Sequence, residues 1–194
     1  VNFVNGTEID LTTLREVRMR TDAIMYLDMH NIMVRFAEDG QKTFPDFENW
    51  AEWVEVFDIV QLNEFECEKV LKVTPSDSGE FLDAAQYVLR MGSKVALVTM
   101  GPEGVALAHR QDDRDYGCII PSGPVGTFVD ATGCGDAFSA GMLWNYLQTG
   151  SPVTAALAGS LIGALNCEVS GIGSLDKARD AASRLDEVSP EVAS

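Results

Sequence analysis

The sequence predicts an α/β protein with a doubly wound, mainly parallel sheet flanked by helices. Two observations support this fold class: short apolar runs alternate with helical stretches from the start of the chain, and a helical layer closes it. No internal repeat or low-complexity linker interrupts the 194 residues, and a hydrophobic content of 46% is sufficient for one sizeable core. We therefore expect one domain with a Rossmann-like arrangement of strands and helices.

The expected strands and helices alternate along the chain. The strands are its most apolar runs, expected at residues 1–4, 23–27, 57–62, 94–99, 104–109 and 117–120. The helices are expected at residues 11–20, 47–56, 66–71, 79–91, 153–167 and 174–188, with a further helical stretch that begins at Gly133. The three strands in succession after residue 94 indicate an antiparallel edge on the parallel sheet. Ser151 and Pro152 are a typical cap and first position for the helix that follows them.

Composition argues against several classes of partner. Fourteen basic and thirty acidic residues give a formal net charge of -16, so nucleic acid and anionic membrane surfaces are poor partners. The four cysteines, at 67, 118, 134 and 167, have no spacing that suits a metal, and nothing in their placement indicates a disulfide framework. Because there is no run of about 18 apolar residues and no charged-then-apolar leader, we expect a soluble protein of the reducing cytoplasm.

The most informative stretch lies at residues 130–136, with the sequence Asp-Ala-Thr-Gly-Cys-Gly-Asp, and an apolar run follows it at once. Two glycines around a small residue let backbone N–H groups approach a ligand closely, and a helix that begins there directs its positive end at that ligand. Asp136 would itself be a poor anion ligand, but a carboxylate beside an anion site is suited to take a proton from an attacking nucleophile. The stretch predicts an anion cradle with a base attached, although glycine-rich turns before helices also occur for packing alone.

This run resembles the second signature of the ribokinase-like (PfkB) family of sugar and nucleoside kinases, whose pattern is Asp, a small residue, Thr or Ser, Gly, Ala or Cys, Gly and Asp. The resemblance implies a ribokinase-like fold and an ATP-dependent phosphotransferase that moves the γ-phosphoryl group to a sugar hydroxyl. It assigns the backbone amides of Gly133, Cys134 and Gly135 to the anion hole, and Asp136 to the role of general base toward the acceptor hydroxyl.

Two further motifs follow predicted strands. Asn63 and Glu66 resemble the Asn-x-x-Glu element of the family, in which both residues act through water on the magnesium and the phosphates; alone, such a cluster more often starts a helix. Thr99, Gly101 and Gly104 resemble the end of a strand and the loop that lies along the nucleotide; alone, they read as a β-turn. Each motif gains its functional interpretation from the stretch at 130–136.

The resemblance implies ATP and magnesium as cofactors and, for some members of the family, potassium. Potassium would be held by Asp130, Thr132 and a loop at residues 166–171, whereas the alternative is that Asp130 simply caps its own loop. Ser160 is implied as a further cofactor-binding residue. Neither Lys nor Arg occurs in residues 130–136, so this is not a Walker A loop, and backbone dipoles and bound cations would have to neutralise the phosphates.

Several other residues receive no catalytic role. A thiol at a helix N-terminus such as Cys134 invites a nucleophile hypothesis, but the family usually places Ala there, so we expect the side chain to be tolerated rather than used. His30 lies where relatives often have Asp-Pro-Asn and is assigned nothing. His109 is expected at the surface near the end of a strand. The three tryptophans are expected in the core or in an interface, at residues 50, 53 and 144.

The resemblance covers the chain from residue 1 to about residue 175. It implies that residues 1–194 are the C-terminal catalytic and nucleotide-binding portion of a single ribokinase-like domain, without the N-terminal part that carries most sugar contacts and the lid. A small sugar is then the implied partner besides the nucleotide, and a homodimer would form through that lid. The alternatives are a nucleoside kinase of the adenosine type and a nucleotide-binding fragment without turnover. A dinucleotide-binding domain is disfavoured because no G-x-G-x-x-G follows the first strand.

Overall fold

The computed structural model describes residues 1–170 apart from residues 2, 5, 124 and 125. The chain divides into two compact units. The first unit comprises Val1–Met100 and Ala106–Cys118, and the second comprises Gly101–Val105 and the residues from Ile119 onward. No helix in the described part of the chain is both long enough and apolar enough to span a membrane.

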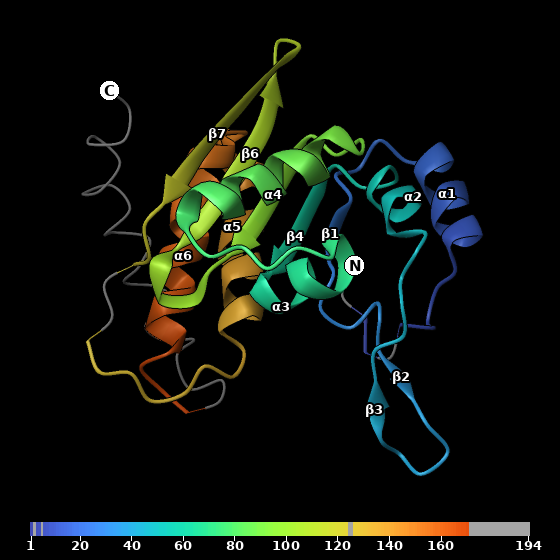
Figure 1. Ribbon diagram of the computed structural model, residues 1–194. Helices are drawn as coiled ribbons and strands as arrows, with labels where there is room; N and C mark the ends of the chain where they lie inside the picture. The colour runs from blue at the N-terminus through green and yellow to red at the C-terminus, as the bar shows by residue number, and fades with distance from the viewer. Residues whose placement is uncertain (2, 5, 124–125, 171–194) are drawn as a thin grey trace. The chain divides into compact units, whose positions relative to one another are not determined.

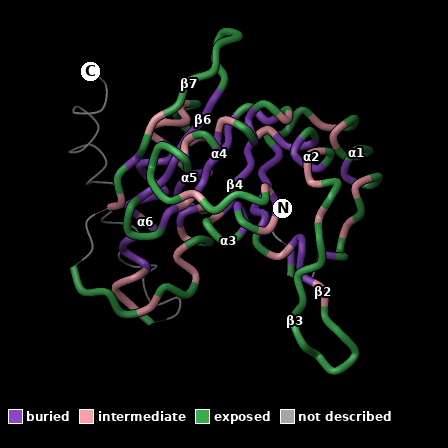
Figure 2. Tube along the Cα trace, viewed as in Figure 1, coloured by how far each residue is buried: buried purple, intermediate pink, exposed green. Residues whose placement is uncertain are grey.

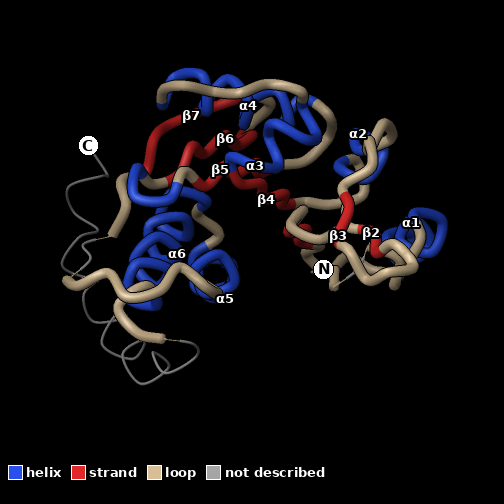
Figure 3. The backbone as a smooth tube through the Cα atoms, turned by 60° about the horizontal axis from the view of Figure 1, so that its bottom comes forward, coloured by secondary structure: helices blue, strands red, loops and turns tan. Residues whose placement is uncertain are grey.

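A five-stranded sheet organises the first unit, with the strand order β1-β4-β5-β6-β7. Its strands are β1 (Tyr26–Asp28), β4 (Ile59–Asn63), β5 (Val95–Thr99), β6 (Val105–Gln111) and β7 (Arg114–Ile120). β1, β4 and β5 run parallel to one another, and Figure 3 shows β4, β5 and β6 side by side. The end of β6 lies beside the start of β5, because Arg110 N donates to Lys94 O at 2.9 Å, so β6 is antiparallel to β5. The predicted mainly parallel sheet with an antiparallel edge is confirmed.

The tight turn between β6 and β7 explains how this edge is made. Asp112 and Asp113 have φ values of 49° and 58°, and two consecutive residues with positive φ are typical of the mirror-image turns that join antiparallel strands. Asp tolerates this conformation better than most residues other than glycine. Figure 2 shows that the tip of this hairpin is exposed, whereas β6 is buried over the part that lies in the sheet.

The helical segments of the first unit are α1 (Leu11–Arg20), α2 (Trp50–Val54), α3 (Glu64–Glu66), the π-helical turn η1 (Cys67–Leu71) and α4 (Ser78–Arg90). Of these, α1, α3 and α4 begin at side-chain caps, whereas α2 and η1 do not. Asp10 Oδ1 accepts from Thr13 N at 2.7 Å, and Asp77 Oδ1 accepts from Glu80 N at 2.9 Å. Each cap satisfies a backbone donor that the first helical turn leaves without a partner, so the ends predicted for α1 and α4 agree with the structure to within a residue or two.

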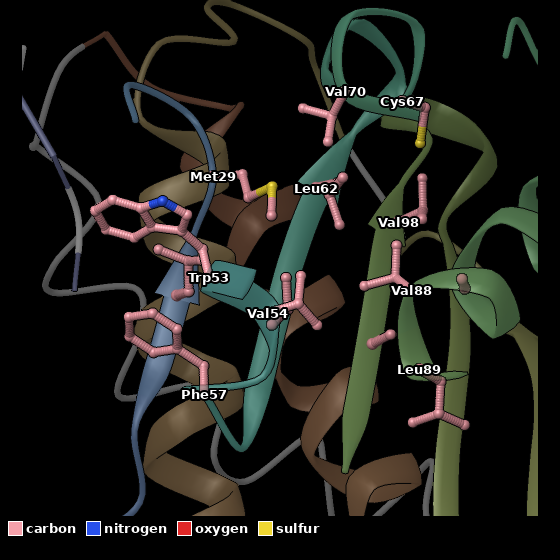
Figure 4. Close-up of a cluster of buried hydrophobic side chains, with 14 of the residues drawn as sticks. Met29, Trp53, Val54, Phe57, Leu62, Cys67, Val70, Val88, Leu89 and Val98 are labelled. Carbon is pink, nitrogen blue, oxygen red and sulfur yellow. The ribbon is translucent and has the colours of Figure 1, made fainter. Parts of the chain in front are cut away.

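One buried cluster joins the sheet of the first unit to these helices. Its members come from alternate positions of the strands and from the apolar faces of α1, α2 and α4, as expected for a sheet face packed against amphipathic helices. Figure 4 shows Val88 of α4 beside Val98 of β5, and Trp53 of α2 above Phe57. The apolar face of α4 therefore packs on β5.

A two-stranded antiparallel ribbon interrupts the alternation that the sequence predicts. It consists of β2 (Arg35–Phe36) and β3 (Lys42–Thr43), and it turns at Gly40, whose φ is 81°. Figure 1 shows it extending away from β1 and β4. Neither strand has a buried residue, so the hydrophobic pattern on which sequence prediction relies carries no signal for this ribbon.

Two packed helices dominate the second unit, α5 (Cys134–Thr149) and α6 (Pro152–Asn166), together with the short 3₁₀ turn η2 (Gly101–Glu103). Gly150 ends α5 with a φ of 66°, and Ser151 caps α6 by accepting from Thr154 N, as predicted. Glycine is required where the helices meet, because a Cβ at Gly159 would lie 2.8 Å from the carbonyl oxygen of Phe138. This close packing sets the N-terminal end of α5 beside the C-terminal end of α6.

Some predictions were wrong or lie outside the described residues. No strand forms among the described residues of 1–4, although Asp28 N donates to Val1 O at 3.1 Å, as a neighbouring strand would. His109 is buried rather than at the surface: it lies inside β6, and its ring stacks on that of Tyr116. Trp53 is buried and Trp50 packs against Tyr87, whereas Trp144 is 46% exposed. The helix predicted at 174–188 lies outside the described residues.

Candidate functional site

A reciprocal pair of polar side chains forms at the carboxyl end of β4. Asn63 is the last residue of β4 and caps α3, and its Oδ1 accepts from Glu66 N at 2.9 Å. In return Glu66 Oε2 accepts from Asn63 N at 2.7 Å, and Glu66 Oε1 accepts from Asn63 Nδ2 at 2.9 Å. Three hydrogen bonds therefore join the two residues, and two of them end on the carboxylate of Glu66, which is only 1% exposed. This explains why the residue pair keeps one geometry.

His30 also reaches this carboxylate, which sequence reasoning missed. Its Nδ1 lies 3.2 Å from Glu66 Oε1, and the hydrogen bond to Glu66 raises the pKa of the imidazole above its usual value. The backbone N–H of His30 donates to Asp28 Oδ1 at 3.0 Å, so the turn after β1 places the ring. The one available signal was that His30 follows a strand whose neighbour in the sheet ends at Asn63, since adjacent parallel strands bring their carboxyl ends together.

Thr99 completes this group in the first unit. The register of the sheet pairs Asn63 with Thr99, and the hydroxyl of Thr99 donates to the carbonyl oxygen of Leu62 at 3.3 Å. We call Asn63, Glu66, His30 and Thr99 the strand-end cluster. Its residues come from the ends of neighbouring parallel strands, which is where ligands bind in open α/β sheets.

In the second unit, residues 130–136 form the turn that begins α5, and we call them the cradle loop. Gly133 has a φ of 77° and precedes the first residue of the helix. A Cβ built at Gly135 would have no described atom within 4 Å, and Asp136 lies exposed on the first helical turn. Open space at Gly135 together with a helix N-terminus gives the geometry that an anion needs in order to approach backbone donors.

The cradle loop is also stabilised internally. Thr132 N donates to Asp130 Oδ1 at 2.9 Å, so Asp130 caps its own loop as the structural alternative predicted. The amide of Cys134 donates to the carbonyl oxygen of Ala131 at 3.1 Å. This turn bond competes with the role proposed for that amide in an anion hole, and it leaves Gly135 as the most open of the three positions.

The C-terminal end of α6 is hydrogen-bonded to the cradle loop. Asn166 is 7% exposed and its Nδ2 donates to the carbonyl oxygen of Thr132 at 3.1 Å. The carbonyl oxygen of Cys167 accepts from the amides of residues 129 and 130, at 2.8 and 3.2 Å.

The sequence prediction of no disulfide was wrong: Cys134 and Cys167 form one, with their Cα atoms 6.0 Å apart. Their separation of 33 residues gave no signal, because only the pairing of α5 with α6 brings them together.

Three further predicted residues lie in the second unit, and packing holds two of them. Gly104 has a φ of 105°, and a Cβ there would lie 2.1 Å from the carbonyl oxygen of Ile120, so only glycine fits. Gly101 has a φ of 53° and starts η2, and a Cβ added there would have no described atom within 4 Å. The hydroxyl of Ser160 donates to the carbonyl oxygen of Pro121 at 2.8 Å and accepts from Gly123 N at 3.1 Å. Packing thus accounts for Gly104 and Ser160, whereas Gly101 lies open.

The chain matches the pfkB family carbohydrate kinases over residues 31–178, which is most of its length and includes the Asn-x-x-Glu element and the cradle loop. This chain belongs to the PfkB family. Among curated proteins it is similar to an uncharacterized sugar kinase of Archaeoglobus fulgidus, with 38% identity over 72 residues, which are 37% of this chain and 26% of that protein.

Solved structures of the ribokinase family share the fold. Arabidopsis thaliana ribokinase, complexed with ribose and ATP, matches with a TM-score of 0.71 and 20% identity over 92% of this chain and 54% of that one. The nucleoside kinase of Methanocaldococcus jannaschii matches with a TM-score of 0.64 and 18% identity over 91% and 52%. A pyrophosphate-dependent kinase of the family, in a sulfate complex, matches with a TM-score of 0.69 and 16% identity over 90% and 57%. The PfkB chain thus spans just over half the length of these relatives.

The strand-end cluster of this PfkB chain fits a magnesium ion only through water. In the described residues no group of three or more His, Cys, Asp or Glu side chains could hold a metal directly. Glu66 Oε1 is contacted by Asn63 Nδ2 and His30 Nδ1, whereas Oε2 accepts one hydrogen bond from Asn63 N and has a further lone pair for a water. Magnesium retains several of its waters and prefers oxygen donors, so contact through water suits Asn63 and Glu66.

Proposed function

We propose that this chain is the nucleotide-binding and catalytic portion of an ATP-dependent kinase that phosphorylates a hydroxyl of a sugar or sugar-like substrate. The observation that carries the proposal is the start of α5, where an open Gly135 and an exposed Asp136 share the first helical turn. An anion at the amides and a base beside it are the two groups that transfer of a phosphoryl group to a hydroxyl requires. The similarity to a ribokinase complexed with ribose and ATP supports the same donor and acceptor class.

Each predicted residue then has a separate task. The amides of Gly133 and Gly135 bind the transferred phosphoryl group, and the amide of Cys134 joins them once it leaves Ala131. Asp136 accepts the proton of the attacking hydroxyl. Magnesium, when bound, neutralises charge on the phosphates. Asn63 and Glu66 orient the waters bound to the magnesium ion. Thr99 and Gly101 border the nucleotide. Gly104 and Ser160 fix the backbone next to them.

A nucleoside kinase is the second candidate. The fold matches the Methanocaldococcus jannaschii nucleoside kinase and an aminoimidazole riboside kinase of Salmonella enterica at TM-scores of 0.64 and 0.65. Sugar and nucleoside kinases would use the cradle loop and Asp136 in the same way, so a panel of free sugars and nucleosides separates them. A fragment that binds nucleotide without turnover is the remaining alternative, and acceptor-dependent formation of ADP by this chain would exclude it.

Substitution of the proposed base is the direct test. Asp136→Asn keeps the size and polarity of the side chain but removes its ability to take a proton, so we expect turnover to fall by about 10²- to 10⁴-fold. The measurement is ADP formation with the best acceptor of the panel, with circular dichroism to verify folding. Asp83→Asn, at an exposed position of α4, is the matched control and should leave turnover unchanged. Near-normal turnover by Asp136→Asn would refute the assignment.

A further inference from the structure

The Cys134–Cys167 pair connects the cradle loop to the end of α6. Cys134 is the first residue of α5, Cys167 caps the C-terminal end of α6, and both residues are only half-buried. Partial exposure allows a small thiol reagent to reach the pair. The pair therefore combines an accessible disulfide with the loop that carries the proposed anion hole.

We infer that Cys134 and Cys167 form a reversible oxidation site that controls how rigidly the cradle loop is held. The disulfide adds a covalent link to a loop whose other attachments are hydrogen bonds from Asn166 and to the carbonyl oxygen of Cys167. These hydrogen bonds end on backbone carbonyl oxygens, although Asn166 Nδ2 also lies 3.7 Å from Cys134 Sγ, so we expect them to remain after reduction. Oxidation thus restricts the motion of the loop without changing its fold.

The reduced state has a defined arrangement as well. A thiol at Cys134 can donate to the carbonyl oxygen of Asp130, since the Sγ lies 3.6 Å from that oxygen. On reduction, the cradle loop therefore loses its covalent link to Cys167 and gains a weak hydrogen bond from the thiol of Cys134 to Asp130. Because the thiol of Cys134 keeps this partner and Cys167 is only half-buried, both states are compatible with a folded second unit.

The oxidant that we propose is a low-molecular-weight disulfide such as oxidised glutathione. The thiolate of Cys134, favoured by its place at a helix N-terminus, attacks one sulfur of the reagent and releases one thiol. The thiolate of Cys167 then attacks the sulfur of Cys134, breaks the mixed disulfide and releases the second thiol. Two electrons pass from the cysteine pair to the reagent, and the two cysteine protons end on the released thiols. Excess reduced glutathione reverses both steps.

The other two cysteines do not compete for this chemistry. Cys67 is fully buried, and burial raises the pKa of its thiol to about 12, so almost no thiolate is available. Cys118 lies on β7, half-buried, and burial raises the pKa of its thiol too. Cys118 therefore supplies a matched control for a partly exposed thiol that lies outside the cradle loop.

Hydrogen exchange in glutathione buffers tests the inference on the full chain without any nucleotide. We expect peptide mapping of the oxidised sample to show the 134–167 link, and the amides of residues 130–136 to exchange about threefold to tenfold more slowly than in the reduced sample. Cys167→Ser and Cys134→Ala should each remove this difference, and Cys118→Ser should retain it. Absence of the link in oxidising buffer, or equal exchange in the two states, would overturn the inference.

The consequence for donor binding rests on the proposed function and is measured separately. A loop already held in its binding conformation loses less entropy when a ligand orders it, so we expect ATP to bind about threefold to tenfold more tightly to the oxidised chain. Equal affinities in the two states, despite different exchange rates, would refute control of donor binding. If ATP binds to neither state while the exchange difference persists, the proposed function fails and the oxidation site stands.

Discussion

The strand-end cluster and the cradle loop are held in place by opposite means. In the strand-end cluster, Asn63 and Glu66 lie three residues apart and satisfy each other, so the local sequence contains nearly the whole arrangement. The cradle loop depends on Asn166 and Cys167, which follow it by thirty residues or more. The Asn63–Glu66 pair therefore keeps its geometry whenever α3 forms. The geometry of the cradle loop depends in addition on its contacts with Asn166 and Cys167, and it responds when those contacts change.

Loss of the disulfide should have the largest effect on stability, and this effect should be confined to the unit that contains the cradle loop. Cross-linking residues 33 apart limits the unfolded chain, which corresponds to about 3–4 kcal/mol of unfolding free energy in the chain-entropy model. We expect Cys167→Ser to destabilise the second unit by up to this amount and to leave the first unit unchanged. Native-state hydrogen exchange measures both units at once. Equal destabilisation of β4 and α5 would show that the two units do not respond separately.

The same contrast between local and distant contacts determines which features of each region could be predicted from the sequence. The caps of α1 and α4, the helix that begins after Gly133 and the strands β4 and β5 were predictable, because their signals lie within a few neighbouring residues. The Asn63–Glu66 pair was predictable for the same reason. His30 against Glu66 and Asn166 against Thr132 were not, because each contact joins segments that only the folded chain brings together.

The β2–β3 ribbon and the buried His109 show two further limits. The ribbon has no buried residue, so no apolar alternation marks it, and its turn at Gly40 reads as an ordinary loop. His109 lies inside β6 at 8% exposure with its ring against Tyr116, where a histidine near the end of an apolar run suggested the surface. The ring contact with Tyr116, which lies on the neighbouring strand β7, cannot be read from the strand that contains the histidine.

Neutralising Glu66 tests whether the strand-end cluster is as self-contained as its geometry indicates. Glu66→Gln retains one acceptor oxygen but places an N–H₂ group where Asn63 N or Asn63 Nδ2 donates, which leaves a buried donor without its partner and costs about 1–3 kcal/mol. The measurement is the free energy of unfolding from urea denaturation. Glu64→Gln, an exposed neighbour on the same turn, should change it by less than about 0.5 kcal/mol. Similar losses for the two variants would mean that the pair adds nothing specific.

The smallest expected effect concerns His30, which follows β1 and therefore comes from a different strand end than Asn63 and Glu66. The hydrogen bond to Glu66 raises the pKa of His30, so the folded state holds this proton more tightly than the unfolded state does. The resulting stabilisation is complete below the unfolded pKa of about 6.5 and is lost as the pH rises through the higher folded value. Because the imidazole is 55% exposed, solvent screening keeps the contribution small, and NMR titration of the ring is a better measurement than denaturation. In Glu66→Gln the pKa should return toward its ordinary value, whereas in Glu64→Gln it should stay raised. A pKa that stays equally raised in both variants would show that His30 responds to the acidic surface in general and does not belong to the strand-end cluster.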